Sequence, residues 1–214
     1  MKRNKFTLIA TIALSILYLA GTSDSTKNVL IIGDSISIGY TPFVAKALAP
    51  EIRVFHNPGN GGSTIRGIDS VEKWLDNKEW DVIVFNFGLH DLVYKDKENK
   101  YDLVNGKVSV PLEDYKKNLE TIVAKLKETT ANLIFVNTSV VPENSAGRDP
   151  GDPSKYNAVA LEVMKTNGIG VVDLYTASLS IHPQNSQPGN VHYTAEGYEQ
   201  LADHVINAIK TALK

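Results

Sequence analysis

The residues with the clearest chemical potential are Gly33-Asp34-Ser35, which directly follow the apolar run Val29–Ile32. A serine at the exit of a buried strand is well placed to attack a substrate, provided that a base takes its hydroxyl proton. His192 is the best candidate for this base. Thr194 and Gly197 predict the start of a helix just after it, so the ring lies in a loop. The pattern indicates nucleophilic chemistry at Ser35.

An attacked acyl group needs hydrogen-bond donors that are fixed in advance around its developing oxyanion. We expect these donors to be the backbone N–H groups of Ser35 and of Gly61 or Gly62, because glycine leaves the backbone open to close approach. A side-chain donor from Gly88-Leu89-His90-Asp91 would complete the set. Each segment alone is also compatible with an ordinary turn, and their shared location is what favours a site.

Apolar runs and helical periodicities alternate along the chain. This alternation predicts an α/β fold in which a parallel sheet carries helices on both faces. The expected strands are Val29–Ile32, Ile52–Phe55, Val82–Phe87, Leu133–Val136 and Val171–Leu174, and the expected helices cover residues 42–49, 68–75, 112–127, 154–166 and 194 to the C-terminus. Residues 95–107 and 142–153 are expected to be surface loops.

Ligands of open α/β sheets bind beyond the carboxyl ends of the strands. Ser35 follows the first strand, the glycine-rich segment 57–63 the second, and His90 the third. The fifth strand leads toward His192. The strand order alone therefore predicts that these residues gather at one edge of the sheet.

Four segments resemble the SGNH, or GDSL, hydrolase family over the whole chain from about Val29. They are residues 33–39 (GDSISIG), 60–64 (NGGST), 88–91 (GLHD) and 191–194 (VHYT), the last followed by Gly197-Tyr198. The resemblance implies a flavodoxin-like, three-layer α/β/α fold with a five-stranded parallel sheet. It also implies esterase activity, often the deacetylation of sugars or of other small acyl esters.

The third segment departs from the family, which usually has Asn where this chain has His90. A neutral histidine also donates one N–H, so a role as an oxyanion donor is chemically sound and is the interpretation we favour. The alternative is that His90 only packs and that the site has two backbone donors.

The last segment departs further, because the family usually has Asp three residues before the histidine and this chain has Gly189. Three groups could orient the His192 ring instead: the Gly189 carbonyl, the side-chain oxygen of Asn190, or an acid from another loop such as Asp152. We expect the Gly189 carbonyl, and hence a Ser35–His192 dyad. Asp34 is expected to hold its turn through nearby N–H groups.

Composition limits the remaining possibilities. The chain has 214 residues, a formal net charge of -2 and no cysteine. Its length suits one domain with a core. Disulfides and thiol chemistry are excluded, and the charge pattern favours no nucleic-acid partner. The histidines lack ligand spacing, so we expect no metal and no cofactor.

The N-terminus has the pattern of a targeting segment. Lys2, Arg3 and Lys5 precede the apolar residues 6–20, and small residues follow at 21–23. We expect a signal peptide over 1–21, a polar leader over 22–27 and a hydrolase domain over 28–214. This predicts a secreted or periplasmic protein without a membrane span after cleavage; an uncleaved anchor is the alternative.

The function expected from these features is that of a secreted serine esterase. It would hydrolyse a short-chain acyl ester. We expect the acyl group to be acetyl and the alcohol component to be a carbohydrate. A lysophospholipase- or thioesterase-like lipid hydrolase, and a catalytically weak binding domain, are the alternatives. The segment 143–152, which contains Arg148 and lies near Tyr156, either contacts substrate or is a solvated charged loop. The sequence indicates no oligomeric state.

Overall fold

The core is built around two adjacent strands whose side chains are buried on both faces. In this computed structural model, which describes residues 26–214, β1 (Lys27–Ile32) and β3 (Val82–Phe85) pair in parallel, with Val29 opposite Val82. Helices cover both faces of these central strands, so the side chains on both faces must be apolar. The continuous apolar runs of β1 and β3 meet this requirement. Phe85 packs edge-on against Phe135 of the next strand, with ring centroids 5.3 Å apart.

The main sheet has five strands in the order β2-β1-β3-β6-β7, and all its pairings are parallel. This confirms the predicted flavodoxin-like sheet. The chain passes from β1 to β2 on one side and then to β3 on the other. In doubly wound sheets such a reversal opens a crevice at the carboxyl ends of the strands. The remaining strands are β2 (Ile52–His56), β6 (Asn132–Val136) and β7 (Gly170–Val172).

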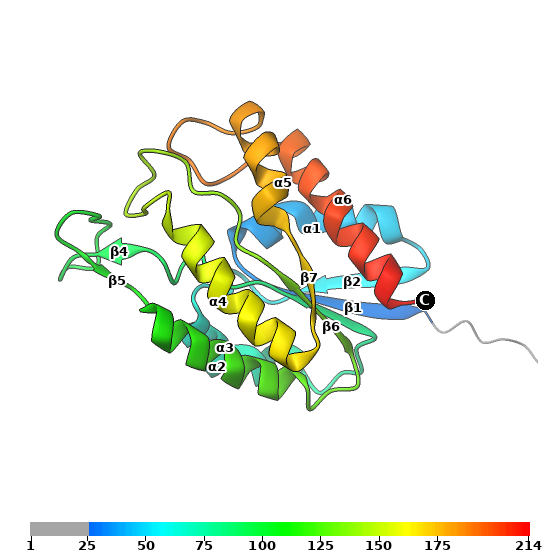
Figure 1. Cartoon of the computed structure of the whole chain (residues 1–214). Coiled ribbons are helices and arrows are strands. Elements are labelled where there is room, and N and C mark those ends of the chain that lie inside the picture. The colour runs from blue at the N-terminus through cyan, green and yellow to red at the C-terminus, as the bar shows by residue number, and fades with distance from the viewer. Residues whose placement is uncertain (1–25) are drawn as a thin grey trace, which may run out of the picture.

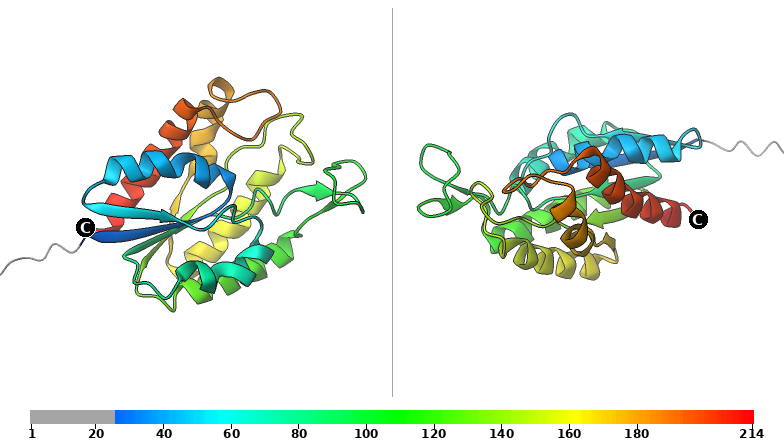
Figure 2. Two further views of the ribbon diagram at one scale, coloured as in Figure 1. Left: turned by 180° about the vertical axis from the view of Figure 1, so that it is seen from behind. Right: turned by 90° about the horizontal axis from the view of Figure 1, so that it is seen from above.

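Helices cover both faces of the sheet, as expected (Figure 1). On one face, α1 packs against α6 and α5 lies beside α6; on the other, α2 packs against α3 and α3 against α4. The left view of Figure 2 shows the sheet between these groups. The helices are α1 (Ser35–Leu48), α2 (Thr64–Leu75), α3 (Leu112–Leu126), α4 (Asp152–Asn167), α5 (Leu174–Ile181) and α6 (Ala195–Ala212), and a short 3₁₀ helix, η1 (His182–Gln184), follows α5.

A small antiparallel hairpin replaces part of a predicted loop. β4 (Tyr94–Lys95) pairs with β5 (Lys107–Val108), so the segment expected to be an irregular loop over 95–107 is closed at its base. The hairpin projects from the body at the end of the molecule opposite the C-terminus (Figure 1). It therefore stands at the edge where the strands end.

Several further boundaries differ from the sequence expectation. The first helix begins at Ser35, well before Pro42, because the Asp34 side chain accepts from the Ile36 N–H at 2.9 Å and caps it. The second begins at Thr64. The fifth strand ends at Val172, and α5 begins at Leu174 because Asp173 caps it by accepting from the Thr176 N–H.

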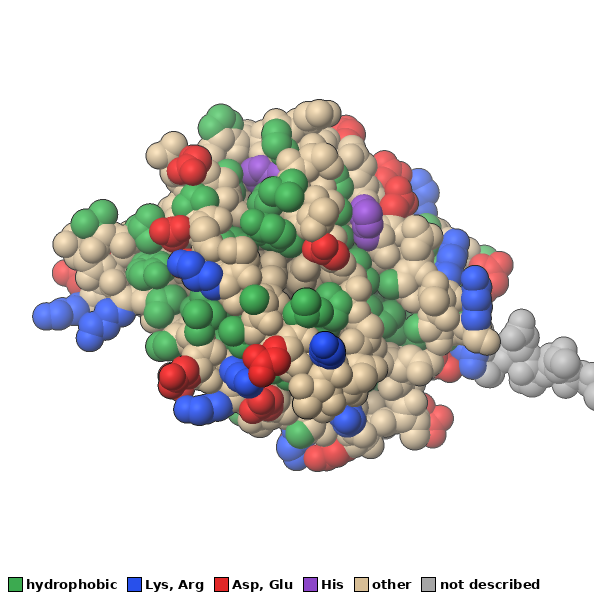
Figure 3. All heavy atoms as spheres, viewed as in Figure 1, with side chains coloured by type: hydrophobic (Ala, Val, Ile, Leu, Met, Phe, Trp, Pro, Cys, Tyr) green, Lys and Arg blue, Asp and Glu red, His purple; other side chains and the backbone are tan. Residues whose placement is uncertain are grey.

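The predicted signal peptide, 1–21, and residues 22–25 of the predicted leader lie outside the described residues. Lys27, the last residue of that leader, begins β1 and pairs with Asp81 at 2.9 Å. Within residues 26–214, no helix is long and apolar enough to cross a membrane. On the face drawn in Figure 3, acidic and basic side chains are interspersed. Lys116 of α3 pairs with Glu162 of α4 at 2.8 Å.

Candidate active site

Ser35 is the first residue of α1, at the carboxyl end of β1. Its hydroxyl oxygen lies 2.9 Å from Nε2 of His192, a contact between residues 157 positions apart in the chain. The positive end of the helix dipole favours negative charge at this position. The structure thus brings together the two residues expected to act as nucleophile and base.

The position of His192 follows from how α6 begins and packs. Thr194 caps α6 by accepting from the Gly197 N–H at 3.3 Å. Farther along, a Cβ on Gly39 of α1 would overlap the ring of Tyr198, so glycine there lets the two helices approach closely. The packing of α6 on α1 therefore holds the loop that carries His192 against Ser35.

The His192 ring is oriented by Asn190. Its Nδ1 lies 2.9 Å from Asn190 Oδ1, and the same oxygen accepts from the His192 backbone N–H at 3.0 Å. Because an amide oxygen only accepts, Nδ1 carries the proton and Nε2 is free to accept from Ser35. The three side chains form a continuous chain of hydrogen bonds from Ser35 through His192 to Asn190.

The expectation that the Gly189 carbonyl orients His192 is therefore corrected, because Asn190 makes this contact through its side chain. Gly189 has a φ of 70°, and a Cβ there would lie 2.9 Å from the Asn144 carbonyl oxygen. An aspartate at this position would be strained. Asp152, the third candidate, instead accepts from Lys155 at the start of α4.

His182 was not singled out by the sequence, yet it supports this network. Its Nε2 lies 2.7 Å from the Asn190 carbonyl oxygen, and its ring stands edge-on to Tyr193. Burial lowers the pKa of His182, which favours the neutral ring. Since the carbonyl only accepts, Nε2–H donates to it and holds the loop at Asn190.

The two glycines of the second segment differ in their surroundings. The Gly61 N–H donates to the Gly33 carbonyl at 2.7 Å, which ties the two loops together. The Gly62 N–H donates to Oδ1 of Asn60 at 2.8 Å, and the Asn60 side chain lines the same cavity as Ser35. Gly61 is thus committed to the fold, whereas a rotation of Asn60 would free the Gly62 N–H for a ligand.

His90 lines the cavity and is half-buried, and its ring makes no hydrogen bond with the residues that the structure describes. Burial lowers the pKa of His90, and the positive charges of Arg148 and Lys95 act in the same direction, while Asp34 opposes them. A neutral ring at this position keeps one N–H donor for a ligand.

A second serine–histidine contact lies nearby but away from the cavity. Ser37 Oγ is 2.7 Å from His56 Nε2 and 2.7 Å from the Asp34 carbonyl oxygen. Ser37 is only 1% exposed, so no substrate reaches it without a rearrangement. The contact joins α1 to β2 and distinguishes Ser35 as the accessible serine of the motif.

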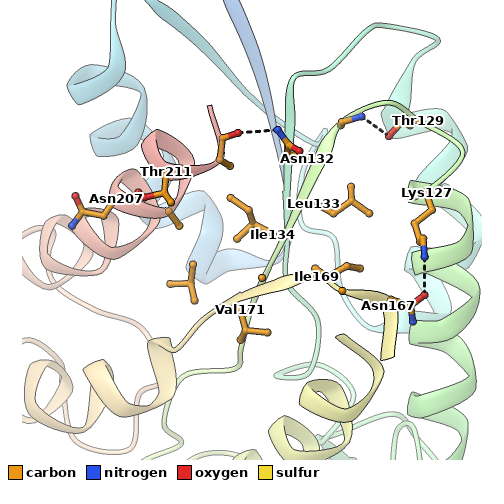
Figure 4. A pocket seen from close by; sticks show the side chains of 16 residues that line it. Lys127, Thr129, Asn132, Leu133, Ile134, Asn167, Ile169, Val171, Asn207 and Thr211 are labelled. Atoms are coloured by element: carbon orange, nitrogen blue, oxygen red, sulfur yellow. Dashed lines mark hydrogen bonds between the residues drawn. The ribbon is translucent and has the colours of Figure 1, made fainter. Parts of the chain in front are cut away.

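The cavity around Ser35 has a volume of about 530 Å³, and its lining combines polar side chains with apolar ones such as Leu89 and Val191. Its wall includes Ser35, Asn60, His90, Asn190 and His192, so most of the predicted site residues face one space. A larger cavity, of about 690 Å³, lies at the amino ends of β6 and β7 beside the end of α6 (Figure 4). None of the predicted site residues lines that second cavity.

The arrangement of a serine at a helix start, a histidine and a polar cavity is that of a serine hydrolase on a flavodoxin-like sheet. The model of the GDSL-like lipase/acylhydrolase family matches residues 31–200, and the chain belongs to this family. The prediction of an SGNH/GDSL-type ester hydrolase is thereby confirmed, as is its broad substrate class of small-molecule esters.

Solved structures agree on the fold. A lipase/acylhydrolase from Enterococcus faecalis superimposes with a TM-score of 0.69 at 22% identity, covering 88% of this chain and 97% of that chain. The acetyl xylan esterase AlAXEase gives 0.69 at 18%, with 85% and 99% covered. An acetylxylan esterase from Geobacillus stearothermophilus gives 0.68 at 19%, with 86% and 94% covered. No curated protein sequence matches the chain.

Proposed function

We propose that the protein hydrolyses short-chain acyl esters through an acyl-enzyme on Ser35. The observation that carries the proposal is the hydrogen-bond chain from Ser35 through His192 to Asn190, which opens onto a polar cavity. It supplies a nucleophile, a base in the required tautomer and a group that orients the base.

In the first half of the reaction, Ser35 Oγ attacks the acyl carbon while its proton passes to His192 Nε2. Asn190 Oδ1 holds the Nδ1–H of the resulting imidazolium. His192 then gives the proton to the departing alcohol oxygen, leaving the acyl group on Ser35. In the second half, Nε2 takes a proton from water and the hydroxide attacks the acyl carbon. The Ser35 oxygen leaves with that proton, and the acid is released.

The oxyanion is held by the N–H groups of Ser35 and Gly62 and by the His90 ring. The Ser35 N–H has no acceptor among the described residues, and Gly62 becomes available when Asn60 turns aside. Gly61 supports the turn through its bond to Gly33 instead of donating to the substrate.

A small acyl group, such as acetyl, on a carbohydrate is the favoured substrate. Polar side chains in the cavity wall, such as Asn60, Gln187 and Asn190, suit a hydroxyl-rich alcohol. Two of the structures with the same fold are described as acetyl xylan esterases. We further propose export to the periplasm or the medium, on the basis of the charged and apolar pattern of residues 2–20.

A lipid acyl ester is the second candidate, and the hairpin region favours it. Leu103 and Val104, between β4 and β5, are 40% and 88% exposed, and Tyr101 of the same segment lines the cavity. Exposed apolar side chains in the segment that carries Tyr101 suit contact with an acyl chain.

An acyl-length series separates the two candidates. We expect kcat/KM for 4-nitrophenyl esters to be highest for acetate and to fall toward decanoate, with acetate also released from acetylated xylo-oligosaccharides. Ser35→Ala should abolish both activities, whereas Ser37→Ala is the matched control that retains the nucleophile. A preference for decanoate would favour the lipid candidate, and full activity of Ser35→Ala would overturn the mechanism.

A further inference from the structure

The cavity contains a buried cation that the proposed reaction does not use. Arg148 lies in the segment before α4 and lines the cavity together with Ser35, His90 and His192. It is 7% exposed. The sequence allowed either a substrate contact or a solvated charged loop for this segment, and the burial of Arg148 excludes the solvated alternative for this side chain.

The guanidinium is fixed in place by its neighbours. Its Nε donates to the Leu89 carbonyl at 3.1 Å and Nη1 donates to the Ala146 carbonyl at 3.3 Å. Its Cζ lies 5.6 Å from the centroid of the Tyr101 ring. These contacts come from the loop after β3, the segment before α4 and the hairpin region. The group is therefore positioned before any ligand arrives.

The charge of Arg148 has no carboxylate partner among the described residues. Within residues 26–214 it forms no ion pair, and besides the two carbonyls the polar side chain that interacts with it is the neutral hydroxyl of Tyr101. Asp34 acts on it only through its field. The described residues that line the cavity include no Asp or Glu. A desolvated cation without a paired anion is costly, and a ligand that supplies the anion recovers that cost.

We propose that Arg148 binds a carboxylate carried by the substrate close to the scissile ester. This inference rests on the proposed esterase function and narrows its substrate class. A planar carboxylate matches the fork of N–H donors on a guanidinium. The carboxylate belongs either to the alcohol part, as in an acetylated acidic sugar, or to the acyl part, as in a dicarboxylic acid half-ester.

Paired substrates test the proposal in the wild-type protein. The first pair is acetylated glucuronic acid against acetylated glucose, followed by acetate release. The second is monoethyl succinate against ethyl butyrate, followed by proton release. We expect kcat/KM for the charged member to exceed that for the neutral member by about tenfold or more in one pair, the size typical of a charge-assisted hydrogen bond. That pair identifies which part carries the carboxylate.

Variants attribute the preference to the guanidinium. Arg148→Met should remove the preference in kcat/KM for the charged over the neutral substrate, and Arg148→Lys should retain part of that preference. Arg53→Met, at the amino end of β2 and exposed, removes the same charge at the opposite edge of the sheet and should leave the ratio unchanged. A purely structural role for Arg148 would lower activity on both substrates without changing their ratio.

Equal kcat/KM values within both pairs in the wild type, or a preference that survives Arg148→Met, would overturn the proposal while leaving the esterase function intact. If Arg148→Met does not fold, two measurements on the wild-type protein still test the proposal. They are the kcat/KM ratios of the two substrate pairs, and whether free glucuronate is a stronger competitive inhibitor than free glucose. If the protein hydrolyses none of these substrates and also does not hydrolyse 4-nitrophenyl acetate, the proposed esterase function itself is wrong.

Discussion

Asn190 occupies the role that a carboxylate fills in a Ser–His–Asp triad. Its amide oxygen fixes the tautomer of His192 but carries no full charge, so it stabilises the imidazolium less than an aspartate would. Asn190→Ala should lower kcat by about tenfold to a hundredfold with a smaller change in KM, because the ring loses its orientation. Esterase kinetics that match the wild type would contradict this role.

Asn190→Asp places a carboxylate where the structure already has the contact, whereas Gly189→Asp would strain a left-handed backbone. We expect Asn190→Asp to keep or raise kcat at neutral pH and to lose that gain as the new carboxyl is protonated at low pH. A pH–rate profile of the two Asn190 variants measures this. Lower activity of Asn190→Asp at every pH would contradict the expectation.

His90 is the residue at which the proposed oxyanion site departs from the family pattern. Replacing it by alanine should lower kcat by about a hundredfold with little change in KM, because the donor is used mainly in the transition state. His90→Asn, which keeps an N–H donor, should recover most of the loss. Equal activity of the alanine variant and the wild type would make His90 a packing residue.

Asp91 joins the loop after β3 to the start of α2, since its Oδ1 accepts from both the N–H and the hydroxyl of Thr64. Burial is the main reason that the pKa of Asp91 is raised to about 7, and its Oδ2 has no hydrogen-bond partner among residues 26–214. In the folded state the carboxyl therefore holds its proton to higher pH than in the unfolded chain. The contribution of this protonated carboxyl to the free energy of unfolding is therefore complete below about pH 4, and it is lost as pH rises toward 7.

We therefore expect Asp91 to lower the free energy of unfolding between pH 4 and 7 by at most about 1.4 kcal/mol per pH unit. Asp91→Asn, which cannot ionise, should flatten this part of the profile. Urea unfolding at several pH values, compared between the two proteins, measures the difference. Parallel profiles would show that Asp91 is not the group responsible.

The sequence was a good guide where an element is specified by a continuous pattern. The apolar runs of β1 and β3 and the amphipathic pattern of α3 identified these elements. The sequence was a weaker guide where a single capping residue sets the start of a helix. Asp34 and Asp173 each cap a helix that begins inside a segment whose sequence also fits a loop or a strand.

The same distinction applies to the site. Ser35 and His192 were predictable because each follows directly from a motif. The partner of His192 was not, because the left-handed turn at Gly189 directs the contact to the side chain of Asn190. His182 and Asn60 also depend on contacts that only the folded loops create. A histidine in a Pro-containing segment, and an Asn-Gly pair, are too common to indicate such roles.

The whole molecule has no cysteine, and its stability depends on the packing of one core around the central strands. Phe135 is fully buried against Phe85, between the two helical layers. Phe135→Ala should lower the free energy of unfolding by about 3–5 kcal/mol. Chemical denaturation followed by fluorescence measures this, and a loss below about 1 kcal/mol would contradict the expected cavity cost.

The same sheet sets the geometry of the reaction, because loops after different strands meet at one edge and only there form the polar cavity. Labelling with a serine-reactive fluorophosphonate, followed by peptide mass spectrometry, shows whether Ser35 is the activated nucleophile. We expect one label per molecule, located on Ser35, and none on the Ser35→Ala protein. Labelling at another residue, or no labelling of the folded wild-type protein, would contradict it.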